Sequence, residues 1–338
     1  MQPPGNPSAG RIGYIDFLKF IGLTCIILAH TGAPDWLMAL RSFDVPFMVI
    51  LSAMLGERSY RRYRQSHASP LRFYTGRVQR LVIPTWLFLL FYFGLRFALS
   101  GKLFAPSYYL ASFSLTRYGI GYVWVIRVYL YSALMIPLCS RIKLSKGSVL
   151  CAAAIYIGYE IACYFQIAAD NKFVDSTFYY IIPYGVLTFL GYHYHALKPK
   201  QRLAVMLASF ALFIGCGLYY WHVYGSVKLV VFAKYPARLY YLSFGVAMSF
   251  LLLILFENRP LKMYGSAPVR FISRNSLWIY LWHILALDVY SYLRLPEIWY
   301  LKLAAVYGIA LGIVFAVNKL TAMLEAKRPL PWLRYFKG

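Results

Sequence analysis

The sequence predicts an all-α integral membrane protein of about ten transmembrane helices, with both termini in the cytoplasm. Three observations predict this class. Hydrophobic residues make up 61% of the 338 residues and charged residues only 14%, whereas soluble domains carry about 25% charge. Apolar segments recur along the whole chain at close to the roughly 20-residue length that crosses a bilayer. Finally, Lys and Arg gather in alternate connections between these segments.

The apolar segments fill most of the chain, so they leave room for short connections but not for a separate soluble domain. We therefore expect one domain over residues 1–338, with a polar leader at 1–10 and a basic cytoplasmic tail at 325–338. The second segment is short for a bilayer, and we expect its helix to continue to about residue 63. The predicted segments are 12–30, 43–57, 81–99, 121–139, 147–167, 177–193, 203–221, 238–256, 275–291 and 300–324.

The positions of Lys and Arg predict the orientation of the bundle. With the N-terminus inside, 23 of these residues fall in the inner segments 1–11, 57–80, 140–146, 194–202, 257–274 and 319–338, and 10 fall in the outer connections. Cytoplasmic loops carry such an excess of positive charge. The net charge of +24 is therefore explained by the basic inner connections, and it gives no reason to expect nucleic acid as a partner. Residues from Arg58 to Arg80 are predicted to form an inner loop.

The five cysteines carry no recognisable chemistry. They lie inside apolar segments or, in the case of Cys139, at the end of one, and the sequence contains no CxxC pair and no spacing typical of metal ligands. We therefore predict neither a metal site nor disulfides.

Three ionisable residues lie in the first apolar segment, where each needs a partner, a wet cavity or a function. Asp16 and Lys19 are three residues apart and can pair on one face. Lys19 and His30 are eleven residues apart, so they share a helix face at a separation of roughly 16 Å along the axis. This stripe suits a ligand with its anionic part near Lys19 and its reacting atom near His30. An alternative is that Lys19 snorkels inward and His30 lies in the membrane interface.

Two further groups of polar residues fall inside apolar segments. Arg127 needs a carboxylate, and Glu160 on the next segment is the nearest candidate, most simply as a structural pair. Ser276, Tyr280 and His283 recur at helical spacing and form one polar face. Such a face either bonds helices together in the membrane or lines a cavity.

Five segments resemble the motifs of the acyltransferase-3 family of membrane acyltransferases, in the same order. The segment 15–19 (IDFLK), followed by His30, resembles the first-helix motif, and 43–53 (FDVPFMVILSA), which includes Ser52, resembles the second. Arg77 and Arg80 before Pro84 are similar to the family's Arg-x-x-Arg. The segments 124–137 and 275–283 (NSLWIYLWH) resemble the fourth helix and a late Tyr-Leu-x-His motif.

The resemblance covers residues 11 to about 290, with two departures. Lys19 stands where the family has arginine, which keeps the charge but loses the bidentate fork. Ala53 stands where the family has glycine, so close helix contact there is in question.

The resemblance implies an O-acyltransferase in the bacterial inner membrane. Members transfer an acyl group, often acetyl, from cytoplasmic acyl-CoA to a hydroxyl of a carbohydrate or glycan precursor, with no permanently bound cofactor. It implies His30 and Lys19 as the catalytic pair, with His30 as the base. Lys19, Arg77 and Arg80 are implied as donor-binding residues, and Arg127 or Tyr280 as an oxyanion donor.

Several points stay open at this stage. A polytopic transporter or a flippase for lipid-linked sugars is the alternative function, although we find no internal repeat of the kind many transporters show. An acyl-histidine intermediate is an alternative to direct transfer. The acceptor, the choice between acetyl and succinyl donors, and the oligomeric state are not predicted.

Overall fold

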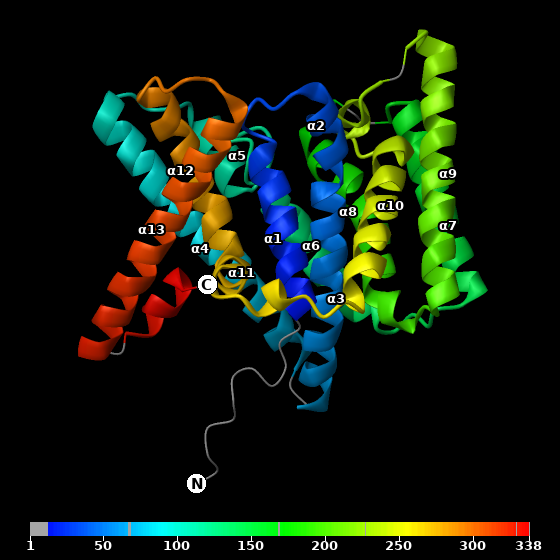
Figure 1. Ribbon diagram of the computed structural model, residues 1–338, viewed down its shortest axis with the longest axis horizontal. Coiled ribbons are helices and arrows are strands. Elements are labelled where there is room, and N and C mark those ends of the chain that lie inside the picture. Colours follow the sequence, from blue (N-terminus) through cyan, green and yellow to red (C-terminus); the bar gives the residue numbers. More distant parts are fainter. Residues whose placement is uncertain (1–12, 67–68, 168–169, 227, 329, 338) are drawn as a thin grey trace.

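We describe the protein from a computed structural model, which covers residues 13–66, 69–167, 170–226, 228–328 and 330–337. The described part consists of helices and their connections and contains no strand. The predicted leader at residues 1–10 lies outside the described residues. Figure 1 shows the helices standing side by side, with α13 and α4 at one side of the molecule, α7 and α9 at the other, and α1, α3 and α10 between them.

Each of the ten predicted apolar segments is a helix. Seven helical stretches in the described residues are long and apolar enough to cross a membrane, so the chain is a multi-pass membrane protein. Three predicted spans, α1, α6 and α12, have only 16, 16 and 17 residues, so ten crossings and the orientation stay predictions. The helices are α1 (Gly13–Leu28), α3 (Asp44–Gln65), α4 (Pro70–Ser100), α6 (Trp124–Cys139), α7 (Lys146–Tyr164), α8 (Lys172–His193), α9 (Pro199–Tyr224), α10 (Leu239–Glu257), α12 (Ser276–Tyr292) and α13 (Trp299–Lys327).

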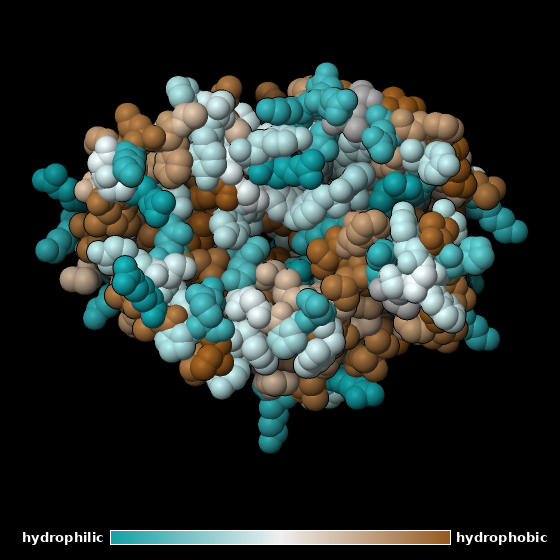
Figure 2. Space-filling view, turned by 90° about the horizontal axis from the view of Figure 1, so that it is seen from above, coloured by the Kyte–Doolittle hydropathy of each residue, from teal (hydrophilic) through white to brown (hydrophobic). Residues whose placement is uncertain are grey.

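Shorter elements connect these helices at both ends of the bundle. One end carries α2 (Asp35–Leu40), α5 (Pro106–Phe113) and the 3-10 turns η1 (Arg41–Phe43) and η3 (Val230–Ala233). The opposite end carries α11 (Ala267–Arg274) and the turn η4 (Lys262–Gly265). We call these the α2 end and the α11 end. Viewed onto the α2 end, Figure 2 shows polar side chains gathered over the middle and hydrophobic ones toward the rim.

The segment 57–80, predicted as an inner loop, is almost entirely helical. As expected, α3 continues past the apolar segment, and it ends only at Gln65. Helix α4 begins at Pro70, a residue whose fixed φ suits the first turn of a helix. Arg77 and Arg80 therefore lie on α4 itself. Arginine favours helix about as much as leucine does, so the connection is helical over most of its length, and its place on the inner side stays a prediction.

The core of the bundle forms around α3, which packs against α1, α6, α8 and α10. Phe47, Ile50 and Met54 of α3 are fully buried. Helices α3 and α8 pack closely although Ala53 of α3 replaces the glycine of the family motif. The residue that allows this contact is Gly191 of α8, because a Cβ at that position would lie only 2.6 Å from the carbonyl oxygen of Ile50.

The outer helices α7, α9 and α13 expose apolar side chains. Helix α9 has no buried residue and packs mainly on α10. Leu207, Leu212 and Leu218 are among its exposed residues. An apolar surface of this extent requires lipid or another apolar partner, in agreement with a membrane location.

The predicted basic tail at 325–338 is not a free extension where the structure describes it. Helix α13 continues to Lys327, and the turn η5 (Pro331–Phe336) then packs against α4. Leu333 is buried, and the ring of Phe336 stacks on Trp278 of α12 at 5.8 Å. The tail is therefore folded onto the α4–α12 side of the bundle.

Candidate active site

Asp16 and Lys19 of α1 both bind α11 through one residue, Ser273. The Ser273 hydroxyl donates to Asp16 Oδ1 at 2.6 Å, and Lys19 Nζ donates to the Ser273 carbonyl oxygen at 2.6 Å. Asp16 is buried and Lys19 is partly buried. The two residues that were predicted to share a helix face thus anchor that face to α11, at the α11 end.

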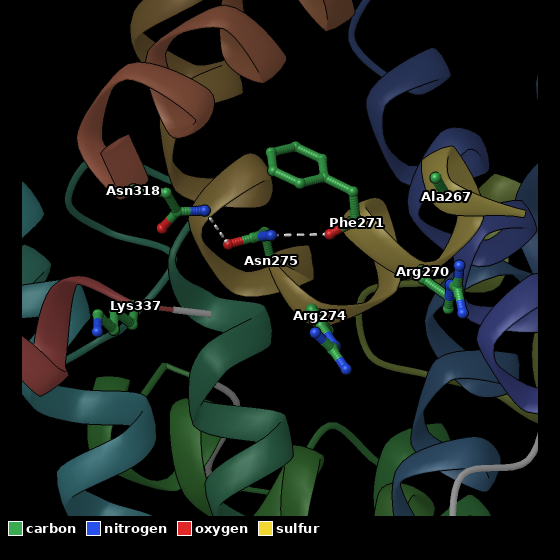
Figure 3. A pocket seen from close by; sticks show the side chains of 7 residues that line it. All are labelled: Ala267, Arg270, Phe271, Arg274, Asn275, Asn318 and Lys337. Carbon is green, nitrogen blue, oxygen red and sulfur yellow. Dashed lines mark hydrogen bonds between the residues drawn. The ribbon is translucent and has the colours of Figure 1, made fainter. Parts of the chain in front are cut away.

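A basic cavity of about 500 Å³ lies next to this anchor (Figure 3). Arg274, which follows Ser273 in the chain, lines it together with Arg270 and Lys337. Asn275, at the start of α12, is held in the wall by two hydrogen bonds, one accepted from Asn318 Nδ2 and one donated to the carbonyl of Phe271. Cationic side chains and a helix N-terminus together favour anions, phosphates in particular.

Arg77 and Arg80 do not line this cavity. The guanidinium of Arg77 lies 5.1 Å from the centre of the Phe73 ring, and Arg80 is exposed. Both arginines lie on α4, and the turn η5 packs against this helix. Lys337, which lines the cavity, directly follows η5 in the chain.

A second cavity of about 750 Å³ is lined by residues of α3 and the end of α8, among them Glu57, Arg64 and His193. Its carboxylate is already engaged, because Arg61 pairs with Glu57 one helical turn away.

At the other end of α1, His30 meets His283. His30 lies in the turn just after α1, and its ring is stacked on that of His283 with centroids 5.5 Å apart. Tyr122 completes the group, with its ring 4.8 Å from His30 and 6.0 Å from His283. The structure therefore brings together two histidines that are far apart in the sequence. We call His30, Tyr122 and His283 the histidine cluster.

The hydrogen bond of His283 defines which of its nitrogens can react. Its Nδ1 lies against the carbonyl oxygen of Tyr280, to which it donates. The remaining nitrogen, Nε2, then carries the lone pair. Nε2 is buried and has no hydrogen-bond partner among the described residues. His30 is only partly buried, whereas His283 is fully buried, so a ligand has easier access to the ring of His30 than to that of His283.

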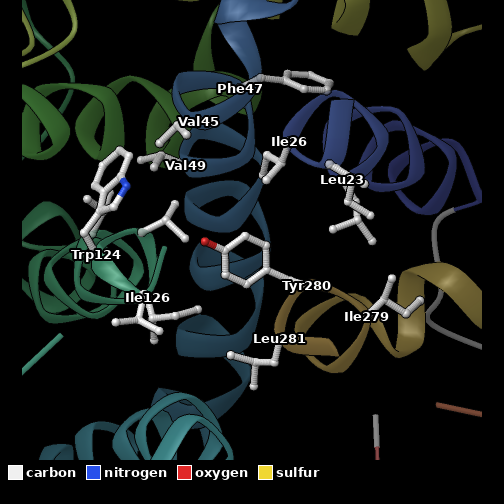
Figure 4. Close-up of a cluster of buried hydrophobic side chains, with 14 of the residues drawn as sticks. Leu23, Ile26, Val45, Phe47, Val49, Trp124, Ile126, Ile279, Tyr280 and Leu281 are labelled. Atoms are coloured by element: carbon white, nitrogen blue, oxygen red, sulfur yellow. The ribbon is translucent and has the colours of Figure 1, made fainter. Parts of the chain in front are cut away.

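Tyr280 supports the histidine cluster rather than facing a ligand. Its hydroxyl donates to the carbonyl oxygen of Tyr122 at 2.5 Å, and Figure 4 shows its ring among apolar side chains of α1, α3 and α6. The proton of this hydroxyl is therefore engaged in joining α12 to the segment before α6, which leaves it poorly suited to the predicted oxyanion role.

Ser276 lies away from the histidine cluster. Ser276 begins α12, so it is roughly 10 Å along the helix axis from His283. Ser52 is partly buried in α3. The predicted polar face of α12 thus divides, because Tyr280 and His283 belong to the cluster and Ser276 lies near the basic cavity.

Arg127 and Glu160 do not pair, contrary to the prediction. Arg127 donates to the hydroxyls of Tyr131 (2.6 Å) and Thr177 (3.2 Å). Glu160 instead accepts from Arg238 Nε and from the backbone N–H of Leu239, both at 2.6 Å. A carboxylate at the first turn of α10 is favoured by the helix dipole. Glu160 therefore fixes the start of α10, which the order of the segments alone does not reveal.

A double-mutant cycle tests this corrected pairing. We expect Glu160→Gln and Arg238→Gln to show a coupling energy of about 0.5–3 kcal/mol in unfolding measurements in mixed detergent. Glu160→Gln and Arg127→Gln share no partner, so we expect their effects to add. Coupling to Arg127 in place of Arg238 would restore the original pairing.

Arg41, Asp44 and Lys234 form a group of charged residues near the histidine cluster that sequence reasoning missed. Arg41 and Lys234 lie in connections outside the apolar segments, where Lys and Arg are ordinarily solvated. All three are buried in the structure. The one feature of the sequence that could have indicated this group is Asp44, a carboxylate inside the second family-like motif.

The site as a whole defines a class of protein: a helical membrane protein with a histidine cluster at one end of a helix and a basic cavity at the other. Comparison with known families agrees. The family model described as an acyltransferase domain, that of the acyltransferase-3 family, matches residues 12–318, and the chain belongs to this family. No curated protein and no solved structure gives a significant match.

Proposed function

We propose that this membrane acyltransferase transfers an acyl group, most simply acetyl, from acyl-CoA to a hydroxyl of a carbohydrate or glycan precursor. The observation that carries the proposal is the histidine cluster, in which the partly buried His30 is stacked on His283 at 5.5 Å. A titratable base held at one end of a bundle, with a basic cavity at the other end, matches a donor that is polyanionic at one end and reactive at the other.

In the proposed reaction, His30 accepts the proton of the acceptor hydroxyl as its oxygen attacks the thioester carbonyl carbon. The new C–O ester bond forms as the C–S bond breaks. Coenzyme A leaves as the thiol after taking a proton, which returns His30 to its neutral form. His283 packs against the His30 ring and limits its orientation. Such positioning contributes to the rate in its own right.

The donor's phosphates are proposed to bind at the α11 end. Lys19, Arg274 and Lys337 lie in or beside the basic cavity, and Arg77 and Arg80 lie on α4, against which η5 packs. Along α1, Lys19 and His30 are separated by roughly 16 Å. An extended pantetheine arm would have to cover a distance of this order, with its thioester at the histidine cluster. With the predicted orientation, the phosphates enter from the cytoplasm of a bacterial inner membrane.

The direct test is release of free coenzyme A by the purified protein in lipid nanodiscs when acetyl-CoA or succinyl-CoA is supplied with glycan acceptors. Appearance of thiol together with a mass shift of the acceptor supports the proposal. Uptake of a lipid-linked sugar across a vesicle membrane, with acyl-CoA left intact, would favour the transporter alternative.

Donor binding can be assigned by two paired substitutions. We expect Arg274→Gln with Lys337→Gln, and separately Arg77→Gln with Arg80→Gln, to raise the Kd for acetyl-CoA at least about tenfold, because hydrogen bonds to charged groups contribute about 1.5–3 kcal/mol each. Isothermal titration calorimetry measures this Kd.

The matched control is Arg62→Gln, which removes an exposed arginine of α3 and should leave the Kd for acetyl-CoA unchanged. If either pair behaves like this control, its residues anchor the bundle at the membrane surface and do not bind the donor.

A further inference from the structure

A buried group of three charges lies at the α2 end of the bundle. Arg41 Nη1 donates to Asp44 Oδ2 at 2.5 Å, and Asp44 Oδ1 accepts from the N–H of Val45 at 2.8 Å. Lys234 follows η3 and completes the group. The exposed fractions of Arg41, Asp44 and Lys234 are only 3%, 1% and 8%.

This group has one positive charge too many. The charges that act on Lys234 are those of Asp44 and Arg41, so a single carboxylate faces two cations. Asp44 is already paired with Arg41. Among the described residues, no acceptor binds the Lys234 ammonium, which lies 5.6 Å from the centre of the Trp124 ring and 5.5 Å from that of Tyr235.

Arg41 also has unused hydrogen-bonding capacity. Its Nε is buried and has no partner among the residues that the structure describes. Burial lowers the pKa of Lys234 below its ordinary value, and Asp44 only partly opposes this effect. A buried cation without an adequate counter-charge is costly for a fold and is retained where it has a partner or a function.

The excess charge lies close to the histidine cluster. The charges of both Lys234 and Arg41 act on His30. Trp124, beneath the Lys234 ammonium, is two residues from Tyr122, whose ring contacts His30. A ligand at His30 therefore lies within the field of two buried cations.

We propose that Lys234 and Arg41 form a subsite for a carboxylate carried by the substrate that reacts at His30. This rests on the proposed function in one respect, namely that His30 marks the place of reaction. A carboxylate would supply the missing counter-charge and accept hydrogen bonds from the Lys234 ammonium and Arg41 Nε.

The carboxylate has two chemical sources. It can belong to the acceptor, as in a hexuronic acid. It can also belong to the acyl group, as in succinyl, which keeps a free carboxylate at its far end. Both present the same charge to Lys234, so the experiment must include a probe for each.

The experiment measures thermal unfolding of the full-length protein in nanodiscs with sodium glucuronate, sodium succinate or glucose, against sodium chloride at equal ionic strength. A ligand that binds only the folded state raises the Tm. We expect at least one carboxylate to raise the Tm of the wild type by about 2 °C or more, and glucose to have no effect. Glucuronate alone would assign the carboxylate to the acceptor, and succinate alone to the acyl group.

The variant Lys234→Met removes the ammonium and keeps the volume of the side chain. We expect it to be at least as stable as the wild type without ligand, because an unbalanced buried charge is replaced by an apolar group. We also expect it to lose the carboxylate-dependent rise in Tm. Lys234→Arg keeps the charge and should retain at least part of the rise, and the matched control Lys228→Gln, on the same connection, should retain all of it.

Four results would overturn this inference. One is an equal rise in Tm for the wild type and Lys234→Met, and a second is no rise in the wild type. Another is a Lys234→Met protein clearly less stable than the wild type, which would make Lys234 a structural partner of Asp44. The last is loss of turnover with acetyl-CoA and a neutral acceptor without any carboxylate effect, which would place Lys234 at the reacting carbonyl. Since the Tm needs no turnover, the results that concern the Tm can occur whether or not acyl transfer is observed.

Discussion

Replacing His30 with alanine is expected to lower the rate of acyl transfer by about 10²–10⁴-fold, the usual contribution of a general base. The substitution removes the ring that is stacked on His283 and touches Tyr122. The donor's phosphates are proposed to bind at the opposite end of α1, so the Kd for acetyl-CoA should stay near its wild-type value. The rate of coenzyme A release and calorimetry with acetyl-CoA measure the two quantities.

The control for this variant is Tyr122→Phe, which keeps an aromatic ring against His30 and should retain most of the activity. Substantial turnover by purified His30→Ala would remove His30 from the role of base. His283 would then be tested next, since its Nε2 carries a lone pair with no partner among the described residues.

The largest effect on stability is expected for Asp44→Ala. Asp44 is the carboxylate that faces Arg41 and Lys234, and all three are buried. Its removal leaves two buried cations without a counter-charge, which should lower the free energy of unfolding by about 3–5 kcal/mol. Unfolding in mixed detergent, followed by circular dichroism, measures the change.

Asp35→Ala is the matched control, because Asp35 is an exposed carboxylate at the start of α2 and should change the free energy of unfolding by about 0.5 kcal/mol or less. Equal stabilities of Asp44→Ala and Asp35→Ala would show that Arg41 finds water or lipid headgroups in place of Asp44.

The positions of the ten apolar segments could be predicted from sequence, and each is helical in the structure, because an apolar segment is a local property of the chain. A helix that crosses lipid must satisfy its own backbone hydrogen bonds, so length and hydropathy suffice to locate it. The differences lie at the helix ends. Helix α3 ends at Gln65, close to the predicted end near residue 63, whereas α4 begins at Pro70, well before the predicted apolar segment at 81.

Helical spacing relates Lys19 to His30 only as far as the helix extends, and α1 ends at Leu28. Lys19 binds α11, and His30, in the turn after α1, stacks against α12. Spacing does not reveal which neighbour a face meets. Arg127 was therefore assigned the wrong partner, since the position of Glu160 beside the start of α10 depends on how α6, α7, α8 and α10 are packed.

Lys234 could not be found from the sequence for a different reason. It is one basic residue in a connection, where lysine is ordinarily exposed. Its burial depends on the turn η3 packing against α10 and on the proximity of Asp44, and neither contact leaves a periodic pattern.

The histidine cluster joins the end of the first helix to the middle of α12, some 250 positions later in the chain. During synthesis at the membrane, a ribosome must deliver nearly the whole polypeptide before His283 can reach His30. Every shorter nascent chain has the first histidine but lacks its counterpart. Competence for the proposed chemistry is therefore acquired in one late step of biogenesis, and a product that stops before α12 is inserted should be inert even if its earlier helices are correctly placed.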